Sequence, residues 1–283
     1  MTRETSRHRR AGEVLVAPAK LTVSLKVIGR RADGYHDIDA EMVTLDLFDR
    51  LVVDPGRNGV EIAPAPGARA DALTCGPDNL VARALAAAGR TAGVRVDKRI
   101  PVGGGLGGGS ADAAAILRWA GVGDLAVAAA LGGDVPFCTL GGRARVEGIG
   151  ERVTPLVYEQ REFVLLVPPF GVGTAAAYRC WDELAAGGSR RTDGSREVNA
   201  LTEAALAVEP RLATWRDLLG ERTGKAPVLA GSGSTWFVEG SAEELHVGDR
   251  EVLACGREQG RLIPVRTVPA GWAGPGPGGA PEE

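Results

Sequence analysis

The feature that most constrains this chain is a glycine run, Pro101-Val-Gly-Gly-Gly-Leu-Gly-Gly-Gly-Ser-Ala111. It separates a strand-like segment at 93–102 from an alanine-rich, helix-like segment at 110–119. Because glycine has no Cβ, such a loop lets backbone N–H groups come close to a ligand and adopts positive φ angles without strain. The N-terminus of the following helix adds a partial positive charge and unpaired N–H donors. The run therefore predicts a loop that binds phosphate.

Three alternative roles for the glycine run fit the sequence less well. A Walker A loop needs a lysine directly before its Ser or Thr, and here Gly109 precedes Ser110. The G-x-G-x-x-G pattern at Gly103, Gly105 and Gly108 usually follows the first strand of a dinucleotide-binding fold, whereas about a hundred residues precede it in this chain. A flexible linker seldom joins a clean strand to a clean helix.

Two polar residues open the helix that is predicted after the loop. Ser110 can cap that helix, or it can direct its hydroxyl to a phosphate or a metal. Asp112 suits the positive end of the helix dipole, so a structural role is as compatible with the sequence as a catalytic one. Both alternatives stay open at this point.

Composition excludes several classes of function. The formal net charge of -3 argues against a nucleic-acid binder that relies on bulk positive charge. No uncharged apolar run approaches the ~20 residues needed to cross a bilayer, and the Arg-rich start does not resemble a signal peptide. Four cysteines without a C-x-x-C pair give no sign of a zinc site or a disulfide framework. We therefore expect a cytoplasmic monomer or weak homodimer that acts on a small molecule and has no nucleic-acid or membrane partner.

Strand-like and helix-like segments mix without a regular βαβ repeat, which favours an α+β fold. A composition shift near Thr154–Arg161 indicates a boundary between two domains. The Arg-rich start, 1–12, and the Pro/Gly-rich end, 269–283, are expected to be a flexible tail and a disordered tail. The expected strands are 13–28 with a break at Ala17–Ala19, 39–53, 93–102, 163–167, 262–268, and 229–238 with an interruption at 231–234; the expected helices are 79–92 capped by Asp78 or Asn79, 110–119, 125–131, 174–186, 199–206 and 210–219.

Five motifs occur in an order that resembles the GHMP kinase superfamily. They are Pro18-Ala-Lys-Leu21, Gly29-Arg-Arg-Ala-Asp-Gly-Tyr-His36, Pro101 to Ala114, Gly133-Asp-Val-Pro-Phe137 and Leu229-Ala-Gly-Ser-Gly-Ser234. The glycine run and the Gly-Asp-Val-Pro segment are typical of the superfamily, and the string that ends in Tyr-His is more specific to one member. The resemblance extends from about Val14 to Val268.

The resemblance implies both a fold and a reaction. The fold is a two-domain α+β structure with an N-terminal ATP-binding domain at 13–155, a C-terminal domain at 156–268 and the active site in the cleft between them. The reaction is the ATP-dependent phosphorylation of the 2-hydroxyl of a cytidine diphosphate-linked methylerythritol, a step of non-mevalonate isoprenoid precursor synthesis. Mg²⁺ is expected to bridge the ATP phosphates, and it needs few protein ligands. We assign no metal-ligating residue, because no dense carboxylate cluster is visible.

The resemblance also implies roles for individual residues. Lys20 and Asp134 match the catalytic lysine and aspartate of the family. Chemically, Asp134 could accept the proton of the acceptor hydroxyl, and the Lys20 ammonium could stabilise the developing negative charge. The implied nucleotide-binding residues are Lys98, Pro101, Val102, Gly103, Gly104, Gly105, Leu106, Gly107, Gly108, Gly109, Ser110 and Ala111.

The implied substrate site lies elsewhere in the sequence. Tyr35 and His36 match residues that hold the cytosine, and Tyr178 falls near a second aromatic residue that sandwiches this base. Gly231, Ser232 and Gly233 belong to the third glycine motif, which closes over the phosphate region. Thr22 stands where the family usually has Asn.

Two further functions are compatible with the same motifs. The chain could be another GHMP-type kinase with a homoserine-like or mevalonate-like acceptor, which should not depend on cytidine. It could also be a catalytically idle nucleotide-binding paralogue, although the presence of both Lys20 and Asp134 argues against that. A dinucleotide-dependent oxidoreductase is less favoured because of where the glycine run lies.

Overall fold

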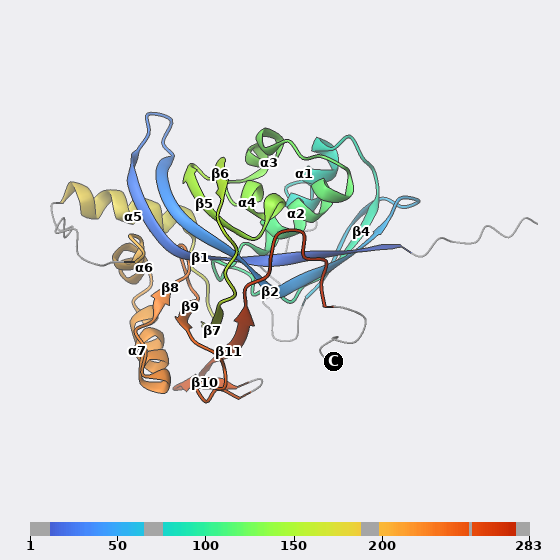
Figure 1. Ribbon diagram of the computed structural model, residues 1–283. Helices are drawn as coiled ribbons and strands as arrows, with labels where there is room; N and C mark the ends of the chain where they lie inside the picture. Colours follow the sequence, from blue (N-terminus) through green and yellow to red (C-terminus); the bar gives the residue numbers. More distant parts are fainter. Residues whose placement is uncertain (1–11, 65–75, 188–197, 249–250, 276–283) are drawn as a thin grey trace, which may run out of the picture.

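The computed structural model describes residues 12–64, 76–187, 198–248 and 251–275, and two sheets organise them (Figure 1). The first sheet has the strand order β3-β4-β2-β5-β6, with β1 paired to β2, among the described residues. Its strands are β1 (Glu13–Arg30), β2 (His36–Asp54), β3 (Gly59–Ala63), β4 (Gly93–Asp97), β5 (Arg143–Gly148) and β6 (Arg152–Pro155). The second sheet has the order β10-β11-β7-β9-β8, formed by β7 (Glu162–Val167), β8 (Val228–Leu229), β9 (Trp236–Glu239), β10 (Val252–Cys255) and β11 (Glu258–Arg266).

The long antiparallel hairpin of β1 and β2 lies at the centre of the first sheet, where β2 also pairs with β4 and β5. Alternating apolar residues produce it, since side chains of a strand point to opposite faces in turn. The predicted break at Ala17–Ala19 was wrong, because β1 continues through it with a shift in register between Pro18 and Lys20. A bulge of this kind accommodates a proline that cannot donate to the ladder. The shift lies directly beside Lys20, which is buried.

Helices α1 (Leu80–Ala87), α2 (Gly108–Trp119), α3 (Leu125–Leu131) and α4 (Val135–Leu140) gather on one side of this hairpin (Figure 1). The small side chains of α2 let it pack closely, and every residue from Ala111 to Leu117 is buried. Asn79 caps α1 by accepting a hydrogen bond from the backbone N–H of Val81, as predicted. The expected strand 93–102 ends earlier, at Asp97, and the helix after it begins two residues earlier than expected, at Gly108.

Helices α5 (Thr174–Ala186), α6 (Thr202–Val208) and α7 (Arg211–Thr223) belong to the second half of the chain, where α5 packs against α6, and α7 packs against β9 and β10 of the second sheet. Its core holds two buried tryptophans, Trp215 and Trp236. Gly260 is required there, because a Cβ at this position would come 2.6 Å from the Trp215 ring. Helix α6 begins at Thr202 rather than at the expected position 199, since the Asn199 side chain accepts from the N–H of Leu201 and precedes the helix.

Several elements and the chain ends differ from the sequence-based expectations. The strands β3, β5, β6 and β10 and the helix α4 had not been expected. The composition shift at Thr154–Arg161 extends from the end of β6 to the residue before β7, where the chain leaves one sheet and enters the other. A disordered tail from 269 onward was wrong for 269–275, because the Trp272 ring packs edge-on against Phe48 with centroids 5.5 Å apart. The basic segment 1–11 and residues 276–283 lie outside the described residues.

The α+β fold is confirmed by this mixture of sheets and helices. Two bridges join the halves of the chain among the described residues: Leu25 pairs with Asn199, and Leu45 pairs with Thr267. No helix within the described ranges is long and apolar enough to cross a bilayer.

Candidate active site

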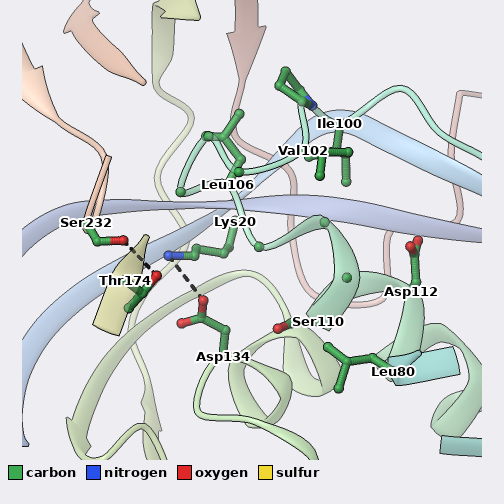
Figure 2. Close-up of a pocket in the computed structure, with 18 of the residues that line it drawn as sticks. Lys20, Leu80, Ile100, Val102, Leu106, Ser110, Asp112, Asp134, Thr174 and Ser232 are labelled. Carbon is green, nitrogen blue, oxygen red and sulfur yellow. Dashed lines mark hydrogen bonds and ion pairs between the residues drawn. The ribbon is translucent and has the colours of Figure 1, made fainter. Parts of the chain in front are cut away.

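A cavity of about 440 Å³ lies where the two halves of the chain meet. The first half contributes the glycine run, β1 and the starts of α1 and α2, and the second half contributes Thr174, Tyr178, Leu201, Gly231 and Ser232. Figure 2 shows Lys20 and Asp134 pointing toward each other on one side of the loop, with Ser110 at the start of α2. The cavity thus combines residues that are far apart in the sequence.

The glycine run needs glycine for two physical reasons. Gly103, Gly105 and Gly107 have φ angles of 74°, 77° and 69°, in the left-handed region where a side chain is strained. A Cβ at Gly105 would also overlap the carbonyl oxygen of Ala230, which belongs to the third glycine motif. The N–H of Thr235 donates to the Gly104 carbonyl at 3.3 Å, so the loop is held directly against the second half of the chain.

Helix α2 begins at Gly108, and its cap position is Gly107, which makes no side-chain capping bond. Ser110 therefore does not occupy the cap position, and it lines the cavity. The first N–H groups of a helix have no partner within the helix. The cavity is lined by Gly107, Gly108, Gly109 and Ser110. These N–H donors and the positive end of the helix dipole therefore face the cavity, an arrangement that favours an anion there.

Lys20 and Asp134 come together beside the glycine run. Their Nζ and Oδ2 atoms are 3.4 Å apart, the Lys20 side chain is 6% exposed and that of Asp134 is 35% exposed. The Lys20 ammonium also donates to the Thr22 hydroxyl at 3.0 Å. Asp134 precedes α4 but makes no capping bond with its side chain, so the carboxylate is not used as a helix cap. The pair is therefore accessible from the cavity.

Lys98 lines the same cavity, but its ammonium is held by two buried carboxylates. It donates to Asp49 and, at 2.8 Å, to Asp112. Burial opposes the charge of Lys98, but attraction by Asp112 and Asp49 outweighs it, so the pKa of Lys98 is raised. Burial raises the pKa of Asp112 to about 7, against the opposing attraction of Lys98. Lys98 therefore lies beside the glycine run with its charge already paired.

The third glycine motif, Leu229–Ser234, closes the cavity from the second half. Asn199 is buried, and its amide donates to the carbonyl oxygens of Leu229 and Gly231 at 2.7 and 2.6 Å. The hydroxyls of Ser232 and Thr174 are 2.9 Å apart (Figure 2). These contacts fix Gly231 and Ser232 at the cavity wall, while Gly233 belongs to the same turn and is absent from the lining.

A second cavity of about 470 Å³ adjoins the first, and the two share Ile38, Thr174 and Tyr178 in their linings. The rings of His36 and Tyr178 are stacked, with centroids 4.8 Å apart and an angle of 27°. Tyr35 also lines this cavity but is 62% exposed. Burial raises the pKa of Tyr178 to about 12, so its hydroxyl stays neutral. Tyr35, His36 and Tyr178, which the resemblance implied for the cytosine, therefore all line this second cavity.

Four residues of these sites had not been singled out from the sequence. Thr174 lines the cavity and Asn199 holds the third glycine motif, and neither carries a local signal, because only the tertiary fold brings them there. Asp182 Oδ1 accepts from the Nε2–H of His36 at 2.7 Å, and its position four residues after Tyr178 places both on one helix face. Asp49 shares a strand face with the buried Leu51 and Val53, a pattern that could have identified it as a buried charge.

Among the described residues, no group of three or more His, Cys, Asp or Glu side chains could hold a metal ion. The carboxylates that line the cavity are those of Asp78, Asp112 and Asp134, and Asp112 is already bound by Lys98. This set is sparse, and it suits a cation that takes most of its ligands from phosphate and water.

Comparisons with known proteins agree with this site. Residues 79–142 match the family described as the GHMP kinases N terminal domain. The chain is 40% identical over 256 residues to 4-diphosphocytidyl-2-C-methyl-D-erythritol kinase of Anaeromyxobacter sp. (strain Fw109-5), an alignment that covers 78% of this chain and 80% of the relative. It is 37% identical to the protein of that name from Pelotomaculum thermopropionicum, with 78% and 87% covered.

Solved structures give the same result. A crystal structure of 4-(cytidine 5'-diphospho)-2C-methyl-D-erythritol kinase is 32% identical with a TM-score of 0.62, and the match covers 88% of this chain and 99% of that one. The homoserine kinase from Cytophaga hutchinsonii is 16% identical with a TM-score of 0.52, covering 95% and 98%, and it shares the fold alone. The chain therefore belongs to the 4-diphosphocytidyl-2-C-methyl-D-erythritol kinase family, and it is an ATP-dependent small-molecule phosphotransferase with the GHMP kinase fold.

Proposed function

We propose that this kinase transfers the γ-phosphoryl group of ATP to the 2-hydroxyl of 4-diphosphocytidyl-2-C-methyl-D-erythritol in non-mevalonate isoprenoid precursor synthesis. The observation that carries the proposal is the Lys20–Asp134 pair, 3.4 Å apart in the first cavity, which adjoins the second cavity at Ile38, Thr174 and Tyr178. One cavity contains the phosphate-binding loop, and the other contains the ring residues. The cytidine end of the acceptor and the triphosphate of ATP would then approach this pair from opposite sides.

The roles of the pair follow from its chemistry. Asp134 accepts the proton of the acceptor hydroxyl while the hydroxyl oxygen bonds to the γ-phosphorus and the bond to the β,γ-bridging oxygen breaks, which releases ADP. The Lys20 ammonium stabilises the negative charge on the transferring group. Thr22 accepts a hydrogen bond from this ammonium and so keeps it at the reacting centre. A positioned base of this kind contributes about 10²–10⁴-fold in rate.

The glycine run binds the triphosphate through its backbone amides and the start of α2. We place Pro101, Val102, Leu106 and Ala111 in this nucleotide site with the six glycines and Ser110. Mg²⁺ fits the sparse set of oxygen donors, and the Ser110 hydroxyl would hold it together with phosphate oxygens and water. When bound, the ion neutralises charge on the phosphates.

The second cavity is proposed to hold the cytosine. Tyr35, His36 and Tyr178 border it, and an aromatic face contributes about 1–3 kcal/mol per stacked base. Because His36 and Tyr178 each cover one face of the other, the exposed Tyr35 is the ring that a base would contact first on entry. Arg30 and Arg179 also line this space and give it positive charge toward a diphosphate.

An ADP-release assay with product detection by mass spectrometry tests the proposal. The purified chain, ATP and MgCl₂ are combined separately with 4-diphosphocytidyl-2-C-methyl-D-erythritol, mevalonate and homoserine. We expect turnover with the cytidine compound alone, and we expect cytidine diphosphate to compete with it. Turnover with mevalonate or homoserine, or ATP binding without turnover on any acceptor, would overturn the assignment.

A further inference from the structure

Three buried charged groups meet behind the glycine run, on three different elements. Asp49 lies on β2, Lys98 follows the end of β4, and Asp112 lies in the first turns of α2. Their side chains are 0%, 5% and 6% exposed. We refer to these three residues as the loop anchor. Figure 2 shows Asp112 well away from Lys20 and Asp134, so the loop anchor is separate from the reacting pair.

The Asp49 side chain bonds the chain just beyond the last backbone pair between β2 and β4. The ladder between β2 and β4 stops at the pair Arg50 and Asp97. Beyond it, Asp49 Oδ1 accepts from the backbone N–H groups of Arg99 and Ile100 at 2.5 and 2.8 Å. The other oxygen, Oδ2, accepts from the Lys98 ammonium. One carboxylate thus satisfies three donors of the segment that leads into the glycine run.

Asp112 ties the other end of the run to the same point. Its Oδ2 accepts from Lys98 Nζ at 2.8 Å, while its Oδ1 is buried without a hydrogen-bond partner among the described atoms. Lys98 also lies close under the loop, since a Cβ at Gly108 would come 3.1 Å from Nζ. The segment before Pro101 is therefore held to β2 by the Asp49 side chain, and Asp112 of α2 is linked to the same point through Lys98.

We propose that Asp49 and Lys98 are positioning residues that hold the glycine run in its nucleotide-binding shape, and that Asp112 contributes one hydrogen bond that an amide can replace. This rests on the proposed nucleotide site but not on the identity of the acceptor. The difference between the two carboxylates comes from their contacts. Asp49 accepts from three donors with both oxygens, whereas Asp112 uses one oxygen for one donor.

Two isosteric variants separate these roles. In Asp49→Asn, the side-chain NH₂ replaces one of the two accepting oxygens. It must then face either a backbone N–H or the Lys98 ammonium, so two hydrogen-bond donors oppose each other at a buried site. In Asp112→Asn, the amide oxygen still accepts from Lys98, and the NH₂ group takes the place of the unpartnered oxygen. The matched control is Asp46→Asn on the same strand. Asp46 also accepts from a backbone N–H and pairs with a cation, but its partner is Arg266 of β11.

ATP affinity is measured by titration calorimetry without any acceptor, and kinetics are measured with the acceptor that the enzyme turns over. For Asp49→Asn we expect at least a tenfold loss of ATP affinity and a matching rise in the KM for ATP, with kcat at saturating ATP within about threefold. Asp112→Asn should lose about threefold at most, and Asp46→Asn should keep its ATP affinity. Unchanged ATP affinity in Asp49→Asn, or an equal loss in Asp112→Asn, would overturn the proposal.

Hydrogen exchange keeps the proposal testable if Asp49→Asn does not fold. In wild type and in Asp112→Asn, the amides of Arg99 and Ile100 should exchange slowly although they lie beyond the end of β4. Exchange as fast as in an exposed loop would refute the anchoring role. Because calorimetry and exchange involve no acceptor, their outcome is independent of whether the cytidine compound is the substrate.

Discussion

The substitution Gly105→Ala tests how the two halves of the chain meet at the nucleotide loop. Gly105 has a φ of 77°, and a Cβ there would overlap the Ala230 carbonyl oxygen and lie 2.9 Å from the Gly233 carbonyl oxygen. Backbone atoms cannot move aside as a flexible side chain can. The loop must therefore shift away from the third glycine motif, or that motif must shift away from the loop.

Gly121→Ala is a matched control. Gly121 follows α2 with a φ of 76°, almost the same backbone conformation, but nothing lies within 4 Å of a Cβ at that position. Both variants incur the left-handed strain of about 1–2 kcal/mol. The unfolded-state effect of replacing glycine by alanine is common to both and cancels in the difference.

The overlap at Gly105 adds about 1–3 kcal/mol, the usual cost of overpacking. We therefore expect the free energy of unfolding to fall by about 2–5 kcal/mol in Gly105→Ala and by about 1–2 kcal/mol in Gly121→Ala. Since ATP must bind the loop in its original shape, the added cost of 1–3 kcal/mol corresponds to an affinity loss of roughly 5–150-fold.

Urea denaturation and titration calorimetry with ATP provide both measurements. Gly121→Ala should bind ATP as the wild type does. If Gly105→Ala equals Gly121→Ala in stability and in ATP affinity, the close contact between the loop and Ala230 contributes nothing to the free energy of unfolding or of ATP binding. The inferred packing of the loop would then be incorrect.

Three further variants or modifications follow from individual contacts. Lys20→Met removes the ammonium beside Asp134, so turnover in the ADP-release assay should fall by about 10²–10³-fold, and activity close to wild type would exclude its role. Asn199→Ala removes three buried hydrogen bonds to Leu229, Gly231 and Leu201, and urea denaturation should show a loss of about 2–5 kcal/mol; an unchanged midpoint would contradict these contacts. Burial, with Asp134 nearby, raises the pKa of Cys138 to about 12, so the native thiol is protonated at pH 8.5 and should resist iodoacetamide until urea unfolds the chain; peptide mapping that finds Cys138 alkylated in the native protein would refute its burial.

The glycine run shows how far local sequence reasoning extends. Its composition predicted a phosphate-binding loop before a helix, and the structure has three left-handed glycines and a helix start there. The sequence could not predict that Ser110 lies inside the helix. The helix begins at Gly108, two residues before the expected start, and Gly107 occupies the cap position. Cap positions depend on φ and ψ at single residues, which a glycine-rich sequence leaves undetermined.

Contacts across the fold were beyond local reasoning. The convergence of Lys20 and Asp134 came from the resemblance, since no periodicity links two residues so far apart in the chain. The role of Asp49 was missed because a single charge on an apolar strand face gives no indication of its partners. The short strands β3, β6 and β10 depend on pairing with neighbours, and such pairing outweighs weak intrinsic preference.

The most direct test of the central claim is the rate of phosphoryl transfer from ATP to 4-diphosphocytidyl-2-C-methyl-D-erythritol by Asp134→Ala, measured in a single turnover together with ATP affinity by calorimetry. We predict a rate lower by about 10²–10⁴-fold, with the ATP dissociation constant within about threefold of wild type. A rate close to that of the wild type, or a loss explained entirely by weaker ATP binding, would contradict the role of Asp134 as the base.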